Sequence, residues 1–167
     1  VWEVPYTLHT EKQTGTLRVV QFADSHVGTT FDGKGLEKYV EEMQQTNPDV
    51  VVITGDFVDD DTSKQDMIDA CHALSKLNPT YGVYFVFGNH DKGYYDPEYR
   101  GYDGDDLIKE LEKNGVHVLQ DDVELIDDRF YLIGRQDRSE EQKGGSRASM
   151  QKLTENLDTS KYSIVLD

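Results

Sequence analysis

Continuous apolar runs alternate along the chain with segments that carry apolar residues at helical spacing. Continuous apolar runs at 49–54 ("DVVVIT") and 81–87 ("YGVYFVF") are typical of strands buried on both faces. Segments 36–45 and 63–77 instead carry apolar residues at helical spacing. Each of these two segments is followed by an Asn-Pro pair, which ends a helix because the residue before proline avoids the helical region. The pattern therefore predicts helices between buried strands.

The rest of the chain divides in the same way. A third helix is predicted over 104–115, where Gly115 suits the C-terminal cap. A polar loop is predicted over 135–149, followed by a helix around Met150, Leu153 and Leu157. Further strands are predicted at 116–119, 123–126, 129–134 and 162–167, and residues 1–24 are predicted to form two strands around a polar turn that ends in Gly15.

Strands that alternate with helices predict an α/β fold with a largely parallel sheet. The 167 residues are enough for one domain with a proper core. We expect a single domain over 1–167, in which 1–15 form an N-terminal hairpin and 16–167 form the core. In such sheets ligands bind at the carboxyl ends of the strands, so candidate chemistry is sought there.

The net charge of the chain limits the kinds of molecule that it is expected to bind. Its net charge is −16, from 17 basic and 33 acidic residues, which argues against nucleic acid and against anionic lipid as a partner. An acidic protein can still handle phosphates when metal ions supply the positive charge. No stretch approaches the roughly 20 apolar residues of a membrane span. Cys71 is the single cysteine, so no intramolecular disulfide is possible.

Metal-capable side chains follow three successive strands. Asp24 and His26 end the first, Asp56 follows the second, and Asn89 and His90 follow the third. In an extended chain, residues two apart point the same way, so Asp24 and His26 can share one ion. The Asp56 carboxylate can bridge two ions, and the Asn89 amide oxygen can bind the second. Oxygen and nitrogen donors suit manganese, iron, zinc or cobalt.

The segments "ADSH", "GDFVD" and "GNHD" resemble the first three motifs of the calcineurin-like metallophosphoesterases, and the resemblance covers roughly 16–167. It implies a metallophosphoesterase-type α/β/β/α sandwich, truncated after its N-terminal half. Segments "GVHVLQDD" and "YLIGRQD" look like a bacterial branch that often carries a membrane or export segment before the domain. The resemblance thus points to an anchored or exported bacterial parent, with this chain soluble.

The resemblance also implies roles for individual residues. Asp24, His26 and Asp56 would bind one divalent metal ion, and Asp56 and Asn89 a second. Hydroxide between the ions would attack the phosphorus of a phosphomonoester or phosphodiester substrate. His90 would stabilise the transition state or protonate the leaving oxygen, with Asp91 orienting its imidazole. Asp59 would support the metal ligands from behind; capping a loop or a helix is the alternative.

The chain departs from the family pattern in one respect. A histidine after a fourth core strand and a later Gly-His-x-His motif are absent, and His9, His72 and His117 are expected to have structural or surface roles instead. We therefore expect the N-terminal part of a phosphoesterase, with weak or no activity and at most partial metal occupancy. An exposed sheet edge would favour dimerisation or domain swapping.

Two other functions compete with this interpretation. The chain could be a non-catalytic binding or regulatory module that retains the first metal motifs, or a nuclease of the same family, which the acidic charge disfavours.

Each of the remaining polar residues has two possible roles. The tyrosines after "GNHD" could form a lid or pack as a loop, Arg135 and Arg138 could bind phosphate or form surface ion pairs, and Asp60 and Asp61 are expected to cap the next helix or be solvated.

Overall fold

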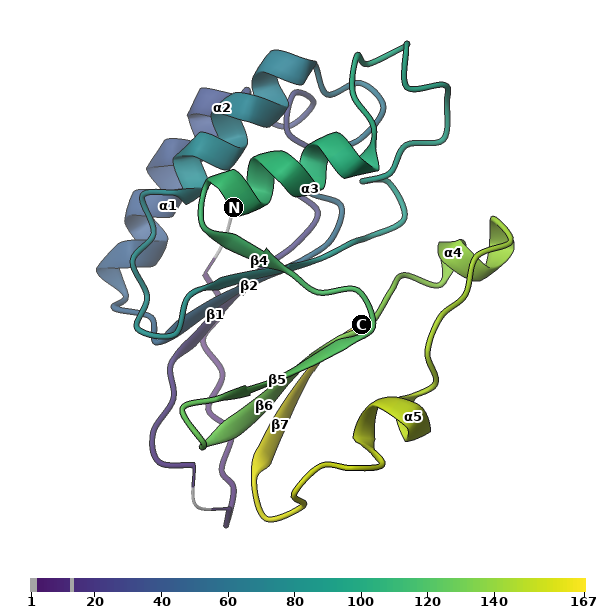
Figure 1. The fold of residues 1–167 in the computed structure, drawn as a ribbon. Helices are drawn as coiled ribbons and strands as arrows, with labels where there is room; N and C mark the ends of the chain where they lie inside the picture. The colour runs from purple at the N-terminus through teal and green to yellow at the C-terminus, as the bar shows by residue number, and fades with distance from the viewer. Residues whose placement is uncertain (1–2, 13) are drawn as a thin grey trace.

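Two sheets pack face to face in the computed structural model, which describes residues 3–12 and 14–167 (Figure 1). The first sheet is parallel, in the order β1-β2-β3-β4. In the second, β5 pairs antiparallel and β7 pairs parallel with the central β6. The strands are β1 Val19–Phe22, β2 Val50–Thr54, β3 Val83–Val86, β4 Val116–Val118, β5 Asp122–Ile126, β6 Phe130–Gly134 and β7 Tyr162–Leu166.

Helices cover the outer faces of both sheets. In Figure 1 three longer helices lie over the first sheet, and two short ones follow β6 in the chain. Local signals set their ends: Ser63 caps α2 through the N–H of Asp66, and Gly115 adopts a φ of 80° just after α3. The helices are η1 Gly33–Gly35, α1 Leu36–Gln45, α2 Lys64–Leu74, α3 Gly104–Lys113, α4 Ser139–Gln142 and α5 Met150–Thr154.

The apolar run of β2 is continuous because this strand contributes to two cores. Val51 and Ile53 point to the core under the helices, whereas Val50 and Val52 point to the core between the two sheets. A third cluster, around Ile133, lies between the second sheet and α5. The predicted α/β fold with a parallel sheet is therefore confirmed, and its truncation after the N-terminal half stays a prediction.

Most predicted elements are confirmed, and α1 spans the predicted 36–45. The loop predicted over 135–149 was wrong in part, since it contains the short helix α4. The helix predicted around Leu157 ends earlier, at Thr154. Of the helices within the described residues, none is long and apolar enough to cross a membrane.

Of the two strands predicted over 1–24, the first is absent from the described residues and the second is confirmed as β1. Residues 3–12 and 14–18 form no strand, while residues 1, 2 and 13 of the predicted hairpin lie outside the described residues. Val4, Tyr6 and Leu8 are 60%, 84% and 81% exposed, so the alternating apolar residues have no face to cover. The segment is held instead by Arg129, which donates to the backbone carbonyls of Thr14 and Thr16. Alternation alone cannot make a strand without a partner.

The exposed edges bear on the predicted dimer. β5 and β7 flank β6 in the second sheet as described, so each has one neighbouring strand. Dimerisation or domain swapping through such an edge stays a prediction.

Candidate metal centre

The loops after β1 and β2 run side by side at the carboxyl edge of the first sheet. The N–H of Asp24 donates to the carbonyl of Gly55 at 3.1 Å, and the N–H of His26 donates to the carbonyl of Asp56 at 3.1 Å. The buried Ser25 hydroxyl donates to the Phe57 carbonyl at 3.0 Å. These bonds hold the two metal-capable loops in a fixed register.

The candidate ligands adopt an unusual backbone conformation. The φ angles of Asp24, His26 and Asp56 are 53°, 40° and 50°, in the left-handed region that residues other than glycine seldom occupy. The prediction that Asp24 and His26 converge because the chain is extended is therefore wrong in its reason. The two side chains converge because left-handed turns, held by the neighbouring loop, direct them to one place.

Three donors meet at this edge. Asp24, His26 and Asp56 each offer one ligand atom, and these atoms lie within 4.8 Å of one another. Asp24 is exposed and the other two are half-buried. No lysine or arginine of the described chain forms an ion pair with either carboxylate. Two carboxylate oxygens and one imidazole nitrogen without a cationic partner fit a divalent metal ion.

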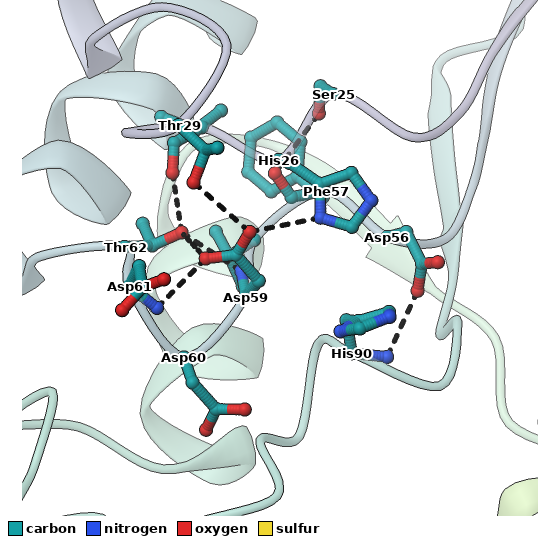
Figure 2. Close-up of polar contacts among 12 residues, drawn as sticks. Ser25, His26, Thr29, Asp56, Phe57, Asp59, Asp60, Asp61, Thr62 and His90 are labelled. Carbon is teal, nitrogen blue, oxygen red and sulfur yellow. Dashed lines mark hydrogen bonds and ion pairs between the residues drawn. The ribbon is translucent and has the colours of Figure 1, made fainter.

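Asp59 positions the imidazole of His26, as Figure 2 shows. Its Oδ2 lies 3.0 Å from His26 Nδ1 and accepts from the Thr29 hydroxyl at 3.3 Å. An ionised carboxylate only accepts, so Nδ1 carries the proton and Nε2 is left to bind a metal. Oδ1 of Asp59 accepts from the N–H of Asp61 and the Thr62 hydroxyl, which fixes the carboxylate in turn. The contact with His26 fits the predicted supporting role of Asp59, and the hydrogen bond from Asp61 fits the alternative of loop capping.

Gly55 and Gly88 allow the second and third loops to touch. A Cβ on Gly55 would lie 2.3 Å from the Gly88 nitrogen, and one on Gly88 would lie 2.3 Å from Asp56 Oδ1. Any side chain here would push the loops apart. The contact lets Asp56 Oδ1 accept a hydrogen bond from the backbone N–H of His90 at 3.0 Å (Figure 2).

Asp91 lies beneath the site and is fully buried. Its Oδ2 accepts from the N–H groups of Gly88 at 2.7 Å and Asp56 at 3.0 Å. Its Oδ1 accepts from the N–H groups of Phe57 at 2.8 Å and Val58 at 3.1 Å. One carboxylate thus holds the backbone of both loops.

The prediction that Asp91 orients the His90 imidazole is wrong. Both oxygens of Asp91 are taken by backbone donors, and no hydrogen bond joins them to that ring in the described chain. Burial raises the pKa of Asp91 to about 7, and the N–H groups that bind its charged form oppose the rise. Asp91 is therefore a structural residue of the site.

His90 lies beside the three donors, and Asn89 precedes it in the chain. The His90 ring meets the His26 ring edge to face, with centroids 5.1 Å apart, and meets the Tyr94 ring at 5.2 Å. Asn89 Nδ2 donates to the Tyr94 hydroxyl, and its amide oxygen accepts no hydrogen bond within the described residues. The predicted acid and the predicted ligand of a second metal thus share Tyr94 as a neighbour.

Sequence reasoning missed Arg100. This buried side chain donates to the carbonyls of Asp59 at 3.3 Å, Asp91 at 2.9 Å and Tyr102 at 3.2 Å, and it stacks on the Tyr102 ring. Arg100 therefore ties the segment after β3 that carries Tyr94, Tyr95, Tyr99 and Tyr102, here called the tyrosine loop, to the backbone at Asp59 and Asp91. No motif marks it, because its partners are backbone carbonyls 2, 9 and 41 residues away, which no residue type in the sequence identifies.

The structure distinguishes between the two roles predicted for Asp60, Arg135 and Arg138. Asp60 accepts from the backbone N–H groups of Tyr94 and Tyr95, so it holds the tyrosine loop and does not cap α2. Arg135 forms an ion pair with Asp167 at 3.0 Å, whereas Arg138 has no such partner among the described residues and lines a cavity.

The remaining histidines and the cysteine lie away from the metal-capable side chains. His9 and His72 are exposed. His117 stacks on Tyr84 beside Gly82, which precedes β3 at the other edge of the sheet. Cys71 is buried in α2. The structural or surface roles predicted for the three histidines agree with these positions.

Comparison with known proteins agrees with the site. The calcineurin-like phosphoesterase family matches residues 17–162, so the chain belongs to that family. An uncharacterized metallophosphoesterase of Aquifex aeolicus is 32% identical over 165 residues, which cover 96% of this chain and 59% of that protein.

Two further relatives are much longer than the matched region. A Danio rerio transmembrane protein with metallophosphoesterase domain is 37% identical over 60% of this chain and 22% of its own length. An uncharacterized metallophosphoesterase of Campylobacter jejuni is 29% identical over 90% of this chain and 37% of its own length. The chain thus spans between about a fifth and three fifths of the length of these relatives.

Proposed function

We propose that the protein hydrolyses a phosphomonoester or phosphodiester with the help of divalent metal ions at the carboxyl edge of β1–β3. The observation that supports this most directly is the convergence of Asp24, His26 and Asp56, whose ligand atoms lie within 4.8 Å of one another. Metal ions bound there would supply the positive charge that polarises a phosphoryl group and activates water.

Each residue then has a defined task. Asp24 and His26 hold the first ion, with Asp59 orienting the imidazole. Asp56 would contribute to both ions, and the amide oxygen of Asn89 would bind the second. The His90 ring lies next to these donors and can give a proton to the leaving oxygen or hydrogen-bond a phosphoryl oxygen.

Metal binding is the first test. Metal-free protein titrated with Mn²⁺ in a calorimeter should bind the ion, and His26→Asn should weaken binding strongly. His72→Asn removes an exposed histidine of α2 and serves as the matched control. Equal Mn²⁺ affinity in the native protein and His26→Asn would refute the metal centre.

Hydrolysis is the second test. Release of nitrophenol from 4-nitrophenyl phosphate and from its bis-ester, with and without Mn²⁺, separates monoesterase from diesterase. Turnover of about 1 s⁻¹ or more, within the usual range of enzymes, would contradict the expectation of weak activity. Mn²⁺ binding without any turnover would contradict the proposed hydrolysis by this chain.

A further inference from the structure

An open cavity is lined in part by Asn89, the residue proposed above to bind a second metal ion. Its volume is about 490 Å³, and it is lined by Asn89 and Tyr94 on one side and by Asp137, Arg138 and Lys143 on the other. Asn89 belongs to both the cavity and the proposed metal site. A molecule in the cavity would therefore lie next to the reacting phosphate.

Contacts between the two walls fix the shape of the cavity. Lys92 forms an ion pair with Glu140 at 3.1 Å, which ties the loop after β3 to α4. Lys143 Nζ lies 3.4 Å from the Gly93 carbonyl and 5.3 Å from the centroid of the Tyr94 ring. The segment around α4 is thus held against the tyrosine loop.

The charge of the lining is unusual for this protein. Arg138 and Lys143 form no ion pair with a carboxylate among the described residues, although the chain carries a net charge of −16. The single carboxylate of the lining, Asp137, already accepts from the N–H of Ser139 at 2.7 Å. Two cations against one hydrogen-bonded carboxylate leave an excess of positive charge beside an acidic site.

We propose that this cavity binds a second anionic group of the substrate, a carboxylate or a further phosphoryl group, through Arg138 and Lys143. A planar guanidinium suits either group because it can donate two parallel hydrogen bonds. This inference rests on the proposed function, since it concerns the part of a phosphate ester beyond the reacting phosphorus.

Matched phosphonates, which are not hydrolysed, test the inference by calorimetry in the presence of Mn²⁺. The carboxylate arm compares 3-carboxyphenylphosphonate with phenylphosphonate. The phosphoryl arm compares methylenediphosphonate with methylphosphonate. In at least one arm the probe with the second anionic group should bind about tenfold more tightly than its partner, the scale of one charge-assisted hydrogen bond.

Variants show where the preference arises. Arg138→Gln and Lys143→Gln should each reduce it severalfold and leave Mn²⁺ affinity unchanged. Lys109→Gln, which changes a mostly exposed lysine of α3, is the control and should keep the full preference.

The outcomes separate this inference from the proposed function. Mn²⁺ binding without a preference in either arm, or a preference that both variants retain, overturns the cavity assignment alone. Absence of binding by every probe also overturns it. A preference that is lost in both variants supports the assignment, even if the His26→Asn titration refutes the metal centre.

Discussion

The carboxylates at the ends of the two sheets differ in whether they form ion pairs with arginine or lysine. After β1 and β2, Asp24 and Asp56 converge with no cationic side chain in ion-pair contact among the described residues. After β7, Asp167 forms ion pairs with Arg135 and Arg147. Residue type is the same, so the difference lies in the partner. Uncompensated carboxylates favour a metal ion, whereas compensated ones join segments of the chain.

Both regions also contain a carboxylate that organises the backbone. Asp91 accepts four N–H groups beneath the first site, and Asp121 accepts the N–H groups of Gln136 at 3.1 Å and Ala148 at 2.8 Å in the second. In both regions, a carboxylate thus holds the backbone through hydrogen bonds from N–H groups. The first region differs because the carboxylates of Asp24 and Asp56, which have no cationic partner among the described residues, lie above the supporting carboxylate of Asp91.

Asp56→Asn should cause the largest effect, because it removes a ligand that we assign to both metals. Mn²⁺ affinity should fall at least about 100-fold, since even partners behind a ligand contribute 10- to 100-fold. Asp167→Asn, at the compensated site, should leave Mn²⁺ affinity unchanged. Equal losses in the two titrations would remove the distinction between the two regions.

Arg100→Met and Arg135→Met compare the two regions through stability. Each variant removes hydrogen bonds to backbone carbonyls and should lower the free energy of unfolding by about 2 kcal/mol in urea titrations. Only Arg100→Met should also weaken Mn²⁺ binding, because Arg100 holds the backbone of Asp59 and Asp91. If Arg135→Met weakened it as much, the effect would reflect general destabilisation.

Asp59→Asn should have a smaller effect on the metal site. Loss of the carboxylate releases the ring of His26, and Mn²⁺ affinity should fall by about tenfold. Asp60→Asn is the neighbouring control, because Asp60 contacts the tyrosine loop and not His26. Unchanged affinity in Asp59→Asn would mean that the ring needs no such support.

The smallest effect concerns Asp66, whose pKa is lowered by hydrogen bonds from the Gly33 N–H and the Ser63 hydroxyl. A lowered pKa stabilises the fold above the ordinary value of 3.8, and this contribution is lost as the pH falls through the lowered value. Asp66→Asn should therefore cost roughly 0.5–1 kcal/mol at neutral pH. Urea titrations should show the gap closing below 3.8.

Long-range partners explain what sequence analysis could not predict. Arg100 is 41 residues from Asp59, and Arg129 is 115 residues from Thr14. Neither the support beneath the site nor the open conformation of the N-terminal segment is visible in a local pattern. Asp91 was misassigned for the same reason, because the neighbouring His90 is near in sequence while Phe57 and Val58 are its partners in space.

The sequence by itself determined the parallel strands, the helices between them and the kinds of donor at their carboxyl ends. Hydrophobic period and chain order are local properties, and parallel strands bring their ends to one edge. Only the tertiary structure decided which carboxylates stay unpaired at Asp24 and Asp56 and which are compensated at Asp91 and Asp167. Hydrogen bonds and ion pairs depend on distances of a few ångströms, which sequence spacing does not determine.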